Sequence, residues 1–171
     1  RLFCPSETAV GHLRDEGRTS GVHCVGDVMA DAMASLAERA SQRSRVLADL
    51  DVSPGAFVLA TVHRAENTDR AERLNAIRKA IDGIQERVVL PLHPRTRKLL
   101  AGSPPLGAHV SVCEPVGYLD MLQLAQHARV VLTDSGGLQK EAYWLGTPCV
   151  TMRDETEWVE TVAAGWNVLA G

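Results

Sequence analysis

The residues best suited to chemistry lie at positions 133–141, where Thr-Asp-Ser-Gly-Gly-Leu-Gln-Lys-Glu follows the apolar run Ala128–Leu132. This order predicts a buried strand, a tight turn with two glycines, and the start of a helix. The first backbone N–H groups of a helix have no intrahelical acceptor and lie at the positive end of the helix dipole. Because such a junction favours a phosphate group, we expect Ser135, Gly136 and Gly137 to hold one.

An ordinary helix start is the alternative interpretation of this turn. Asp134 or Ser135 would then cap the helix, and the glycines would only allow the tight turn. Glu141 lies about one and a half turns into the helix, away from the dipole end. It is either solvated or accepts hydrogen bonds from sugar hydroxyls, as acidic residues do for ribose in related α/β sites.

His63 and Arg64 directly follow the apolar run Phe57–Val62. Arginine offers a planar fork of donors for phosphate, and histidine donates from either ring nitrogen. Capping of the next helix by Asn67 or Thr68 would explain the polar residues that come after them. It would not explain the His-Arg pair, so we expect this pair to contact an anionic ligand.

Two further loops contain candidates. His93 follows Val88–Leu92 and precedes Pro94, which keeps it out of helical geometry. It is either a structural residue or part of a cleft. The loop Pro115–Tyr118 follows Val110–Cys113 and offers a platform for a flat base, although its composition also fits an ordinary loop and helix start.

Alternating strands and helices must position these loops. The expected strands are the short apolar runs Val22–Val25, Phe57–Val62, Val88–Leu92, Val110–Cys113, Val130–Thr133, Cys149–Met152 and Trp166–Leu169. The expected helices are Thr8–Asp15, Val28–Arg39, Arg43–Leu50, Asp69–Ile81, Thr96–Ala101, Leu119–Gln126, Leu138–Leu145 and Glu157–Ala163. Continuous Val-rich runs favour parallel strands that are covered on both faces. The chain therefore predicts an α/β fold, a Rossmann-like parallel sheet with helices on both faces.

The polar residues gather at one end of these strands. The carboxyl ends lead into the loops already named and into Arg153–Glu157, where a helix cap by Thr156 is the simpler interpretation. The opposite ends, such as Pro54–Ala56 and Gly146–Pro148, are plain turns. Because ligands of open parallel sheets lie beyond the carboxyl ends, this asymmetry indicates a single binding edge.

Composition excludes several classes of function. The chain has 171 residues, of which 45% are hydrophobic and 23% charged, and its net charge is −3. These values are ordinary for a soluble globular domain and unlike a nucleic-acid or anionic-membrane binder. No run reaches transmembrane length, and no signal-peptide pattern opens the chain. The four cysteines are widely spaced without a CxxC pair, which predicts buried free thiols in a reducing cytoplasm rather than disulfides or zinc.

Common catalytic motifs do not occur. The chain contains no P-loop, no GxGxxG, no zinc-ligand spacing, no HExxH and no GxSxG. Ser135 is therefore not expected to be a hydrolase nucleophile. The first residue is Arg1, and it opens directly into a strand-like segment, so we expect a piece of a longer protein.

Together the motifs resemble the non-hydrolysing UDP-N-acetylglucosamine 2-epimerases. The segments that carry the resemblance, in chain order, are Phe3–Glu7, Val25–Val28, His63–Asn67, His93-Pro94, Thr133–Gly137 with Glu141, Leu145–Pro148 and Arg153–Glu157. The segments Glu155–Glu160 and Gly165–Asn167 look more like the branch that acts on diacetamido-glucuronic acid sugars.

The resemblance implies the C-terminal half of a two-domain, glycosyltransferase-B-like fold. Residues 1–20 would end the N-terminal domain and include the crossover, and residues 21–171 would form a UDP-binding domain that is truncated at its end. The implied catalytic residues are His63, Arg64 and His93. The implied UDP ligands are Ser135, Gly136, Gly137 and Glu141, and the loop platform adds Pro115 and Tyr118 as expected contacts of UDP.

The implied reaction is an isomerisation. UDP is eliminated from a UDP-N-acetylhexosamine and added back with C2 inverted, without metal or cofactor, in cytoplasmic synthesis of cell-envelope polysaccharide. The full-length protein would be a homodimer with no nucleic-acid or membrane partner, and the fragment without its N-terminal domain would be inactive. The alternatives are a glycosyltransferase of the same architecture and a non-catalytic UDP-sugar-binding module.

Overall fold

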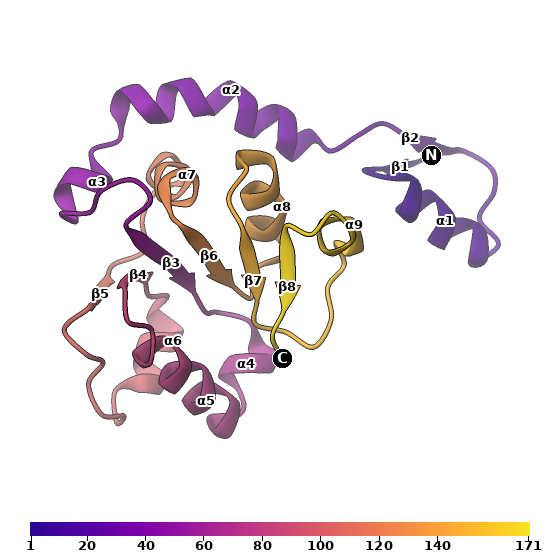
Figure 1. Cartoon of the computed structure of the whole chain (residues 1–171). Helices are drawn as coiled ribbons and strands as arrows, with labels where there is room; N and C mark the ends of the chain where they lie inside the picture. The colour runs from indigo at the N-terminus through magenta and orange to yellow at the C-terminus, as the bar shows by residue number, and fades with distance from the viewer.

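A six-stranded parallel sheet forms the centre of the molecule, in the strand order β5-β4-β3-β6-β7-β8 (Figure 1). The computed structural model describes residues 1–171. The strands of this sheet are β3 (Phe57–Thr61), β4 (Arg87–Pro91), β5 (Val110–Cys113), β6 (Val130–Thr133), β7 (Cys149–Thr151) and β8 (Asn167–Leu169). The chain runs outward from β3 to β5, returns to β6 beside β3, and then runs outward to β8. This order confirms the predicted Rossmann-like α/β fold.

Helices cover both faces of the sheet (Figure 1). In chain order, the helices of the whole molecule are α1 (Glu7–Asp15), α2 (Val28–Arg43), α3 (Val46–Asp49), α4 (Ala65–Thr68), α5 (Ala71–Asp82), α6 (Pro94–Leu100), α7 (Tyr118–His127), α8 (Gly136–Leu145) and α9 (Val159–Ala163). None of them combines the length and apolar character that a bilayer crossing requires.

Strand β3 shows how the sequence builds two cores. Successive side chains of a strand point to opposite faces. Phe57 and Leu59 accordingly join the cluster under α3, α7 and α8, whereas Val58 and Ala60 join the cluster under α5 and α6. All five residues of β3 are buried, so the strand needs an uninterrupted apolar run rather than alternation.

A small N-terminal unit stands apart from the main sheet (Figure 1). Strands β1 (Leu2–Cys4) and β2 (Val22–Cys24) pair in parallel and are joined through α1. Helix α2 then crosses to the main body and packs against α7. The domain division between residues 20 and 21 stays a prediction. Strand β2 follows this division in the sequence but pairs with β1, which precedes it.

Several predicted boundaries were wrong. Helix α2 continues to Arg43, because no glycine or proline interrupts it and the buried Ala40 packs in its last turns. The helix expected over Asp69–Ile81 is α5, which begins two residues later, and the short helix α4 before it was not expected. Asn67 and Thr68 are buried within α4, and the N-cap of α5 is Arg70, which makes no side-chain cap hydrogen bond. The tertiary contacts of Asn67 explain why it does not cap a helix.

Two smaller expectations also changed. The residue that precedes α9 is Trp158 rather than Thr156, and the Thr156 hydroxyl instead accepts a hydrogen bond from the Trp158 N–H at 3.0 Å. All four cysteines are free, as predicted. Their predicted burial holds for Cys4 and Cys149 but not for Cys113, which is half-buried, or for Cys24, which is exposed on β2 of the small N-terminal sheet.

Candidate functional site

A cavity of about 440 Å³ opens beyond the carboxyl ends of β3, β4 and β6. This is the point where the strand order reverses, which is the usual ligand position in open α/β sheets. The lining residues are Met29, Thr61, Val62, His63, Pro91, His93, Pro115, Val116, Met121, Ser135, Gly137, Leu138 and Glu141. The cavity therefore combines an apolar wall with a few polar groups, as small-molecule sites do.

The start of α8 forms one wall of this cavity. Ser135 is the N-cap, and its Oγ accepts a hydrogen bond from the Leu138 N–H at 3.4 Å. The N–H groups of Gly136 and Gly137 belong to the first turn and have no intrahelical acceptor. A Cβ on Gly137 would lie 3.6 Å from the Met29 side chain, so a larger residue would extend into the cavity. Ser135 thus caps the helix, as the alternative interpretation expected, and the N–H groups of Gly136 and Gly137 have no intrahelical acceptor at the helix start.

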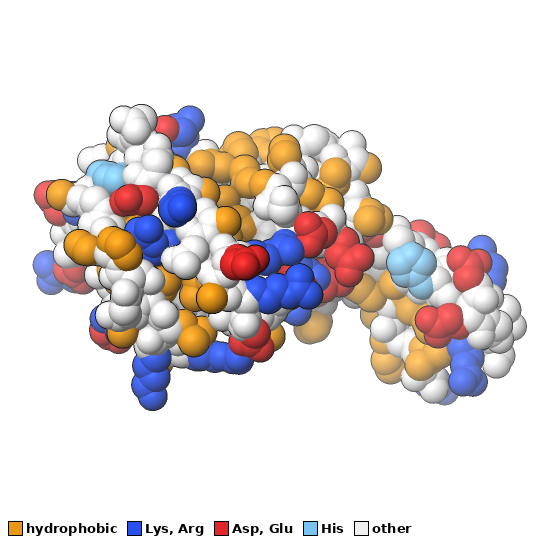
Figure 2. All heavy atoms as spheres, turned by 90° about the horizontal axis from the view of Figure 1, so that it is seen from below, with side chains coloured by type: hydrophobic (Ala, Val, Ile, Leu, Met, Phe, Trp, Pro, Cys, Tyr) orange, Lys and Arg blue, Asp and Glu red, His pale blue; other side chains and the backbone are white.

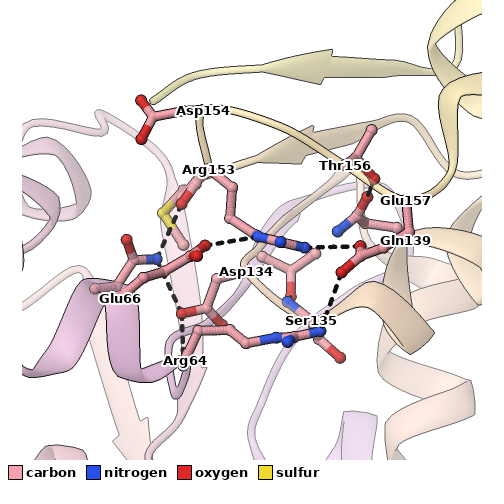
Figure 3. Close-up of polar contacts among 12 residues, drawn as sticks. Arg64, Glu66, Asp134, Ser135, Gln139, Arg153, Asp154, Thr156 and Glu157 are labelled. Atoms are coloured by element: carbon pink, nitrogen blue, oxygen red, sulfur yellow. Dashed lines mark hydrogen bonds and ion pairs between the residues drawn. The ribbon is translucent and has the colours of Figure 1, made fainter.

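The carboxylate of Asp134 connects the loops after β6 and β3. It is fully buried and accepts hydrogen bonds from the backbone N–H groups of His63 and Arg64, at 3.0 and 2.9 Å (Figure 3). The Asn67 amide donates a further bond at 3.0 Å. Burial alone would raise the pKa of Asp134, but hydrogen bonds from His63, Arg64 and Asn67 hold it below its usual value.

His63 and Arg64 point to different places. His63 lines the cavity, and its Nδ1 lies 3.2 Å from the Asp134 carboxylate. Arg64 is not part of the lining; its guanidinium lies 3.8 Å from Glu157 and covers Gly136, where a Cβ would approach it to 3.3 Å. The absence of a side chain at Gly136 leaves room for this arginine.

A network of ion pairs lies on the Arg64 side of the α8 start (Figure 3). Arg153 is 6% exposed and bonds Glu66 at 2.6 Å and Glu157 at 2.8 Å. The hydrogen bond from Arg153 lowers the pKa of Glu157. The network connects α4 to the loop after β7, so Arg64 sits among carboxylates whose charge Arg153 partly neutralises.

Glu141 is buried rather than solvated, with 5% of its surface exposed. The Tyr118 hydroxyl donates a hydrogen bond to its Oε1 at 2.8 Å. Burial raises the pKa of Glu141, and burial together with Glu141 raises the pKa of Tyr118 to about 12. Tyr118 is outside the cavity lining and reaches it through Glu141, whereas Pro115 is part of the apolar wall.

The sequence motifs did not identify every residue of the site. Met29, from the first turn of α2, lines the cavity and carries no motif signal. The sequence predicts Asp134 only as a helix cap, although an acidic residue directly after a buried strand at this edge of the sheet also indicates a partner in a neighbouring loop. No group of three or more His, Cys, Asp or Glu side chains is placed to hold a metal ion. Acidic and basic side chains interleave on the face in Figure 2, which has no large field of one sign.

Comparison with known proteins adds a family to this geometry. The family model described as UDP-N-acetylglucosamine 2-epimerase matches residues 1–171. A "UDP-N-acetylglucosamine 2-epimerase homolog" from Methanococcus maripaludis is 46% identical over 99% of this chain and 49% of its own length. A "UDP-2,3-diacetamido-2,3-dideoxy-D-glucuronate 2-epimerase" from Pseudomonas aeruginosa is 49% identical over 99% of this chain and 48% of its own.

Solved structures show the same relationship. The UDP-GlcNAc 2-epimerase of Methanocaldococcus jannaschii, in complex with UDP-GlcNAc and UDP, matches with a TM-score of 0.89 and 38% identity. That match covers 99% of this chain and 50% of the solved chain. The chain thus spans about half the length of the relatives it matches.

Proposed function

The chain belongs to the UDP-N-acetylglucosamine 2-epimerase family, and from this premise we propose that it is the UDP-binding half of such an enzyme. The whole enzyme would invert C2 of a UDP-N-acetylhexosamine. The observation that carries the proposal is the cavity at the β3/β6 reversal, which brings the α8 start, two histidines and Glu141 together. The Methanococcus maripaludis relative is described as a UDP-N-acetylglucosamine 2-epimerase homolog, and the Methanocaldococcus jannaschii structure is a complex with UDP-GlcNAc and UDP.

The cavity offers a separate place for each part of UDP. Pro115, Val116 and Met121 provide an apolar surface for the flat uracil ring. Glu141 has one oxygen held by Tyr118, which leaves the other for a ribose hydroxyl. The first N–H groups of α8 suit the diphosphate, because they are unpaired donors at the positive end of the dipole.

Expulsion of UDP builds negative charge on the leaving diphosphate. Donors that meet this charge are most effective when they are already oriented before the bond breaks. We assign this task to the α8 start with His93, and to Arg64 once its guanidinium turns from Glu157 toward the ligand. The groups that remove and return the C2 proton we assign to the N-terminal half, so the chain alone would bind UDP without turnover.

The remaining features of the whole enzyme are also proposals. Residues 1–20 would end the N-terminal domain, residues 21–171 would be the UDP-binding domain, and the complete enzyme would be a cytoplasmic homodimer. The diacetamido-glucuronate branch is favoured by the 49% identical relative from Pseudomonas aeruginosa. No metal or cofactor takes part in the proposed reaction.

Calorimetric titration of this chain with UDP tests the proposal. We expect binding that weakens in Ser135→Ala and in Arg64→Ala, since each variant removes a group beside the diphosphate. Ser6→Ala is the matched control for the first variant, because Ser6 is also an N-cap that accepts from the Ala9 N–H at 3.3 Å, but it caps α1, which does not line the cavity. Arg129→Ala is the control for the second, since Arg129 pairs with Glu86 outside the cavity lining.

The outcomes separate the proposal from its rivals. Absence of UDP binding would overturn it. Binding that is unchanged in both test variants would remove Ser135 and Arg64 from the site. Epimerisation of UDP-N-acetylglucosamine by the 171-residue chain alone would contradict the assignment of proton transfer to the other half, and transfer of sugar to an acceptor would indicate a glycosyltransferase.

A further inference from the structure

The two histidines that line the cavity have different partners at the same ring nitrogen. The Nδ1 of His63 faces the carboxylate of Asp134 at 3.2 Å. The Nδ1 of His93 faces the backbone N–H of Arg95 at 3.2 Å. One partner can only accept a hydrogen and the other can only donate one. Since a neutral imidazole carries one N–H and one bare nitrogen, the two rings must differ in where the hydrogen sits.

For His63 the partner requires a hydrogen on Nδ1. Asp134 is fully buried and accepts hydrogen bonds from two backbone N–H groups and from the Asn67 amide. These donors favour the ionised form of the carboxylate. An ionised carboxylate has only acceptors, so the His63 ring must supply the hydrogen of the contact. The neutral ring then has a bare Nε2 on the side away from Asp134.

For His93 the local sequence requires the opposite arrangement. His93 is the N-cap of α6, and Pro94 occupies the first helical position without an N–H of its own. The Arg95 N–H is therefore the first donor of the helix, and the Nδ1 of His93 accepts from it. A nitrogen that accepts this bond cannot carry a hydrogen. The hydrogen of the neutral ring must be on Nε2.

We infer that the cavity holds its two histidines in opposite tautomers, with Asp134 as the positioning residue that fixes His63. His93 then presents an Nε2–H that donates to an anionic oxygen without first taking up a proton. His63 presents a bare Nε2 that accepts from a hydroxyl group. The naming of the ligand groups, a phosphate oxygen and a sugar or ribose hydroxyl, rests on the proposed function; the tautomers do not.

Long-range ¹H–¹⁵N correlation of the ¹⁵N-histidine-labelled chain reads the tautomers directly. The chain has 6 histidines, and His63→Gln and His93→Gln assign the two relevant spin systems. At a pH of about 8.5, about two units above the usual histidine pKa, we expect a hydrogen on Nδ1 of His63 and a bare Nδ1 in His93. A bare Nδ1 in His63, or a protonated Nδ1 in His93, would overturn the inference.

Asp134→Asn tests the positioning role. We expect the His63 ring to shift toward the Nε2–H form, while the His93 signals stay unchanged. A purely structural Asp134 would leave the tautomer of a folded variant as it was, and that result would refute the positioning role. Should Asp134→Asn not fold, the wild-type spectra still decide the tautomers.

Titration with inorganic pyrophosphate tests whether His93 donates to an anion and His63 does not. We expect affinity to fall about tenfold in His93→Ala and less than about twofold in His63→Ala, because only His93 offers an uncharged donor to the anion. Equal losses in the two variants would overturn the division of roles. A chain that binds neither pyrophosphate nor UDP would instead refute the proposed function, and the tautomer result would stand independently.

Discussion

The two sides of the α8 start differ in the charged groups that lie on them. The cavity side carries His63, Gly137 and Glu141 against an apolar wall. The other side, around Gly136, is filled by Arg64 and the ion pairs of Arg153. Consecutive residues thus serve different surfaces, since His63 and Gly137 face the cavity while Arg64 and Gly136 lie against the network.

This difference teaches how the site combines openness with rigidity. Polar groups that face an open cavity lack protein partners. They therefore do not fix the positions of the loops that carry them. The ion pairs of the buried Arg153, and Asp134 between the two sides, provide that support. Arg64 already has a carboxylate neighbour in Glu157, and ligand binding would require an exchange of partners.

Loss of Asp134 should damage both sides and have the largest effect. Asp134→Ala leaves two backbone N–H groups and the Asn67 amide without their acceptor in a buried site. We expect the free energy of unfolding in urea to fall by about 3 kcal/mol and UDP binding to be lost. In the control Asp154→Ala, whose side chain is 71% exposed, the unfolding midpoint should not change. Similar stabilities of the two variants would contradict the central role of Asp134.

A larger residue at Gly137 should damage the cavity side alone. In Gly137→Val the side chain extends toward Met29 and the space expected for the diphosphate. We expect UDP affinity in calorimetry to fall by about 2 kcal/mol, roughly thirtyfold. Gly136→Ala is the control, because its Cβ meets the movable end of Arg64 and not the cavity. A greater loss of UDP affinity in the control would reverse the assignment of the two glycines.

Removal of Arg153 should damage the network side alone. Arg153→Met leaves Glu66 and Glu157 without their shared partner and removes a buried, doubly bonded guanidinium. We expect the free energy of unfolding to fall by about 2 kcal/mol. Arg129→Met, which breaks an exposed ion pair, should cost less than about 0.5 kcal/mol. An equal loss in the free energy of unfolding in the two variants would show that burial of Arg153 does not strengthen its ion pairs.

The Tyr118 hydroxyl sharpens the comparison within the cavity. Tyr118→Phe removes the hydrogen bond to Glu141 and leaves a buried carboxylate oxygen without its donor. We expect UDP affinity to fall by about 1 kcal/mol, roughly fivefold, while the affinity for inorganic pyrophosphate, which lacks a ribose, stays the same. A parallel loss for both ligands would place Tyr118 on the diphosphate instead.

Acid should reduce the stability difference between wild type and Arg153→Met. The hydrogen bond from Arg153 lowers the pKa of Glu157 in the folded chain. A carboxyl group whose pKa is lower in the folded chain stabilises the fold at pH values above its unfolded pKa, which is about 4.3 for Glu. This stabilisation is lost as the pH falls through the pKa of the folded chain. Asp134 titrates in both proteins, so its contribution cancels. Urea unfolding between about pH 6 and pH 3 measures the difference, and a gap that widened in acid would refute this linkage.

Much of the fold was predictable because its signals are local. Buried parallel strands need continuous apolar runs, and the predicted strands from β3 to β8 agree with the structure to within a residue or two. The end of α2 and the short helix α4 were not predicted. Those boundaries depend on which polar residues find tertiary partners, as Asn67 does with Asp134 and the Met152 carbonyl.

The sequence by itself determined the α/β architecture, the edge of the sheet at which the cavity opens, and the family, because strand periodicity and short motifs are properties of neighbouring residues. Only the tertiary structure decided that His63 faces the cavity while Arg64 faces Glu157, and that the Tyr118 hydroxyl donates to Glu141. It also decided the partners of the histidines. The physical reason is separation along the chain: His63 and Asp134 are 71 residues apart, and only the pairing of β3 with β6 brings them into hydrogen-bonding distance.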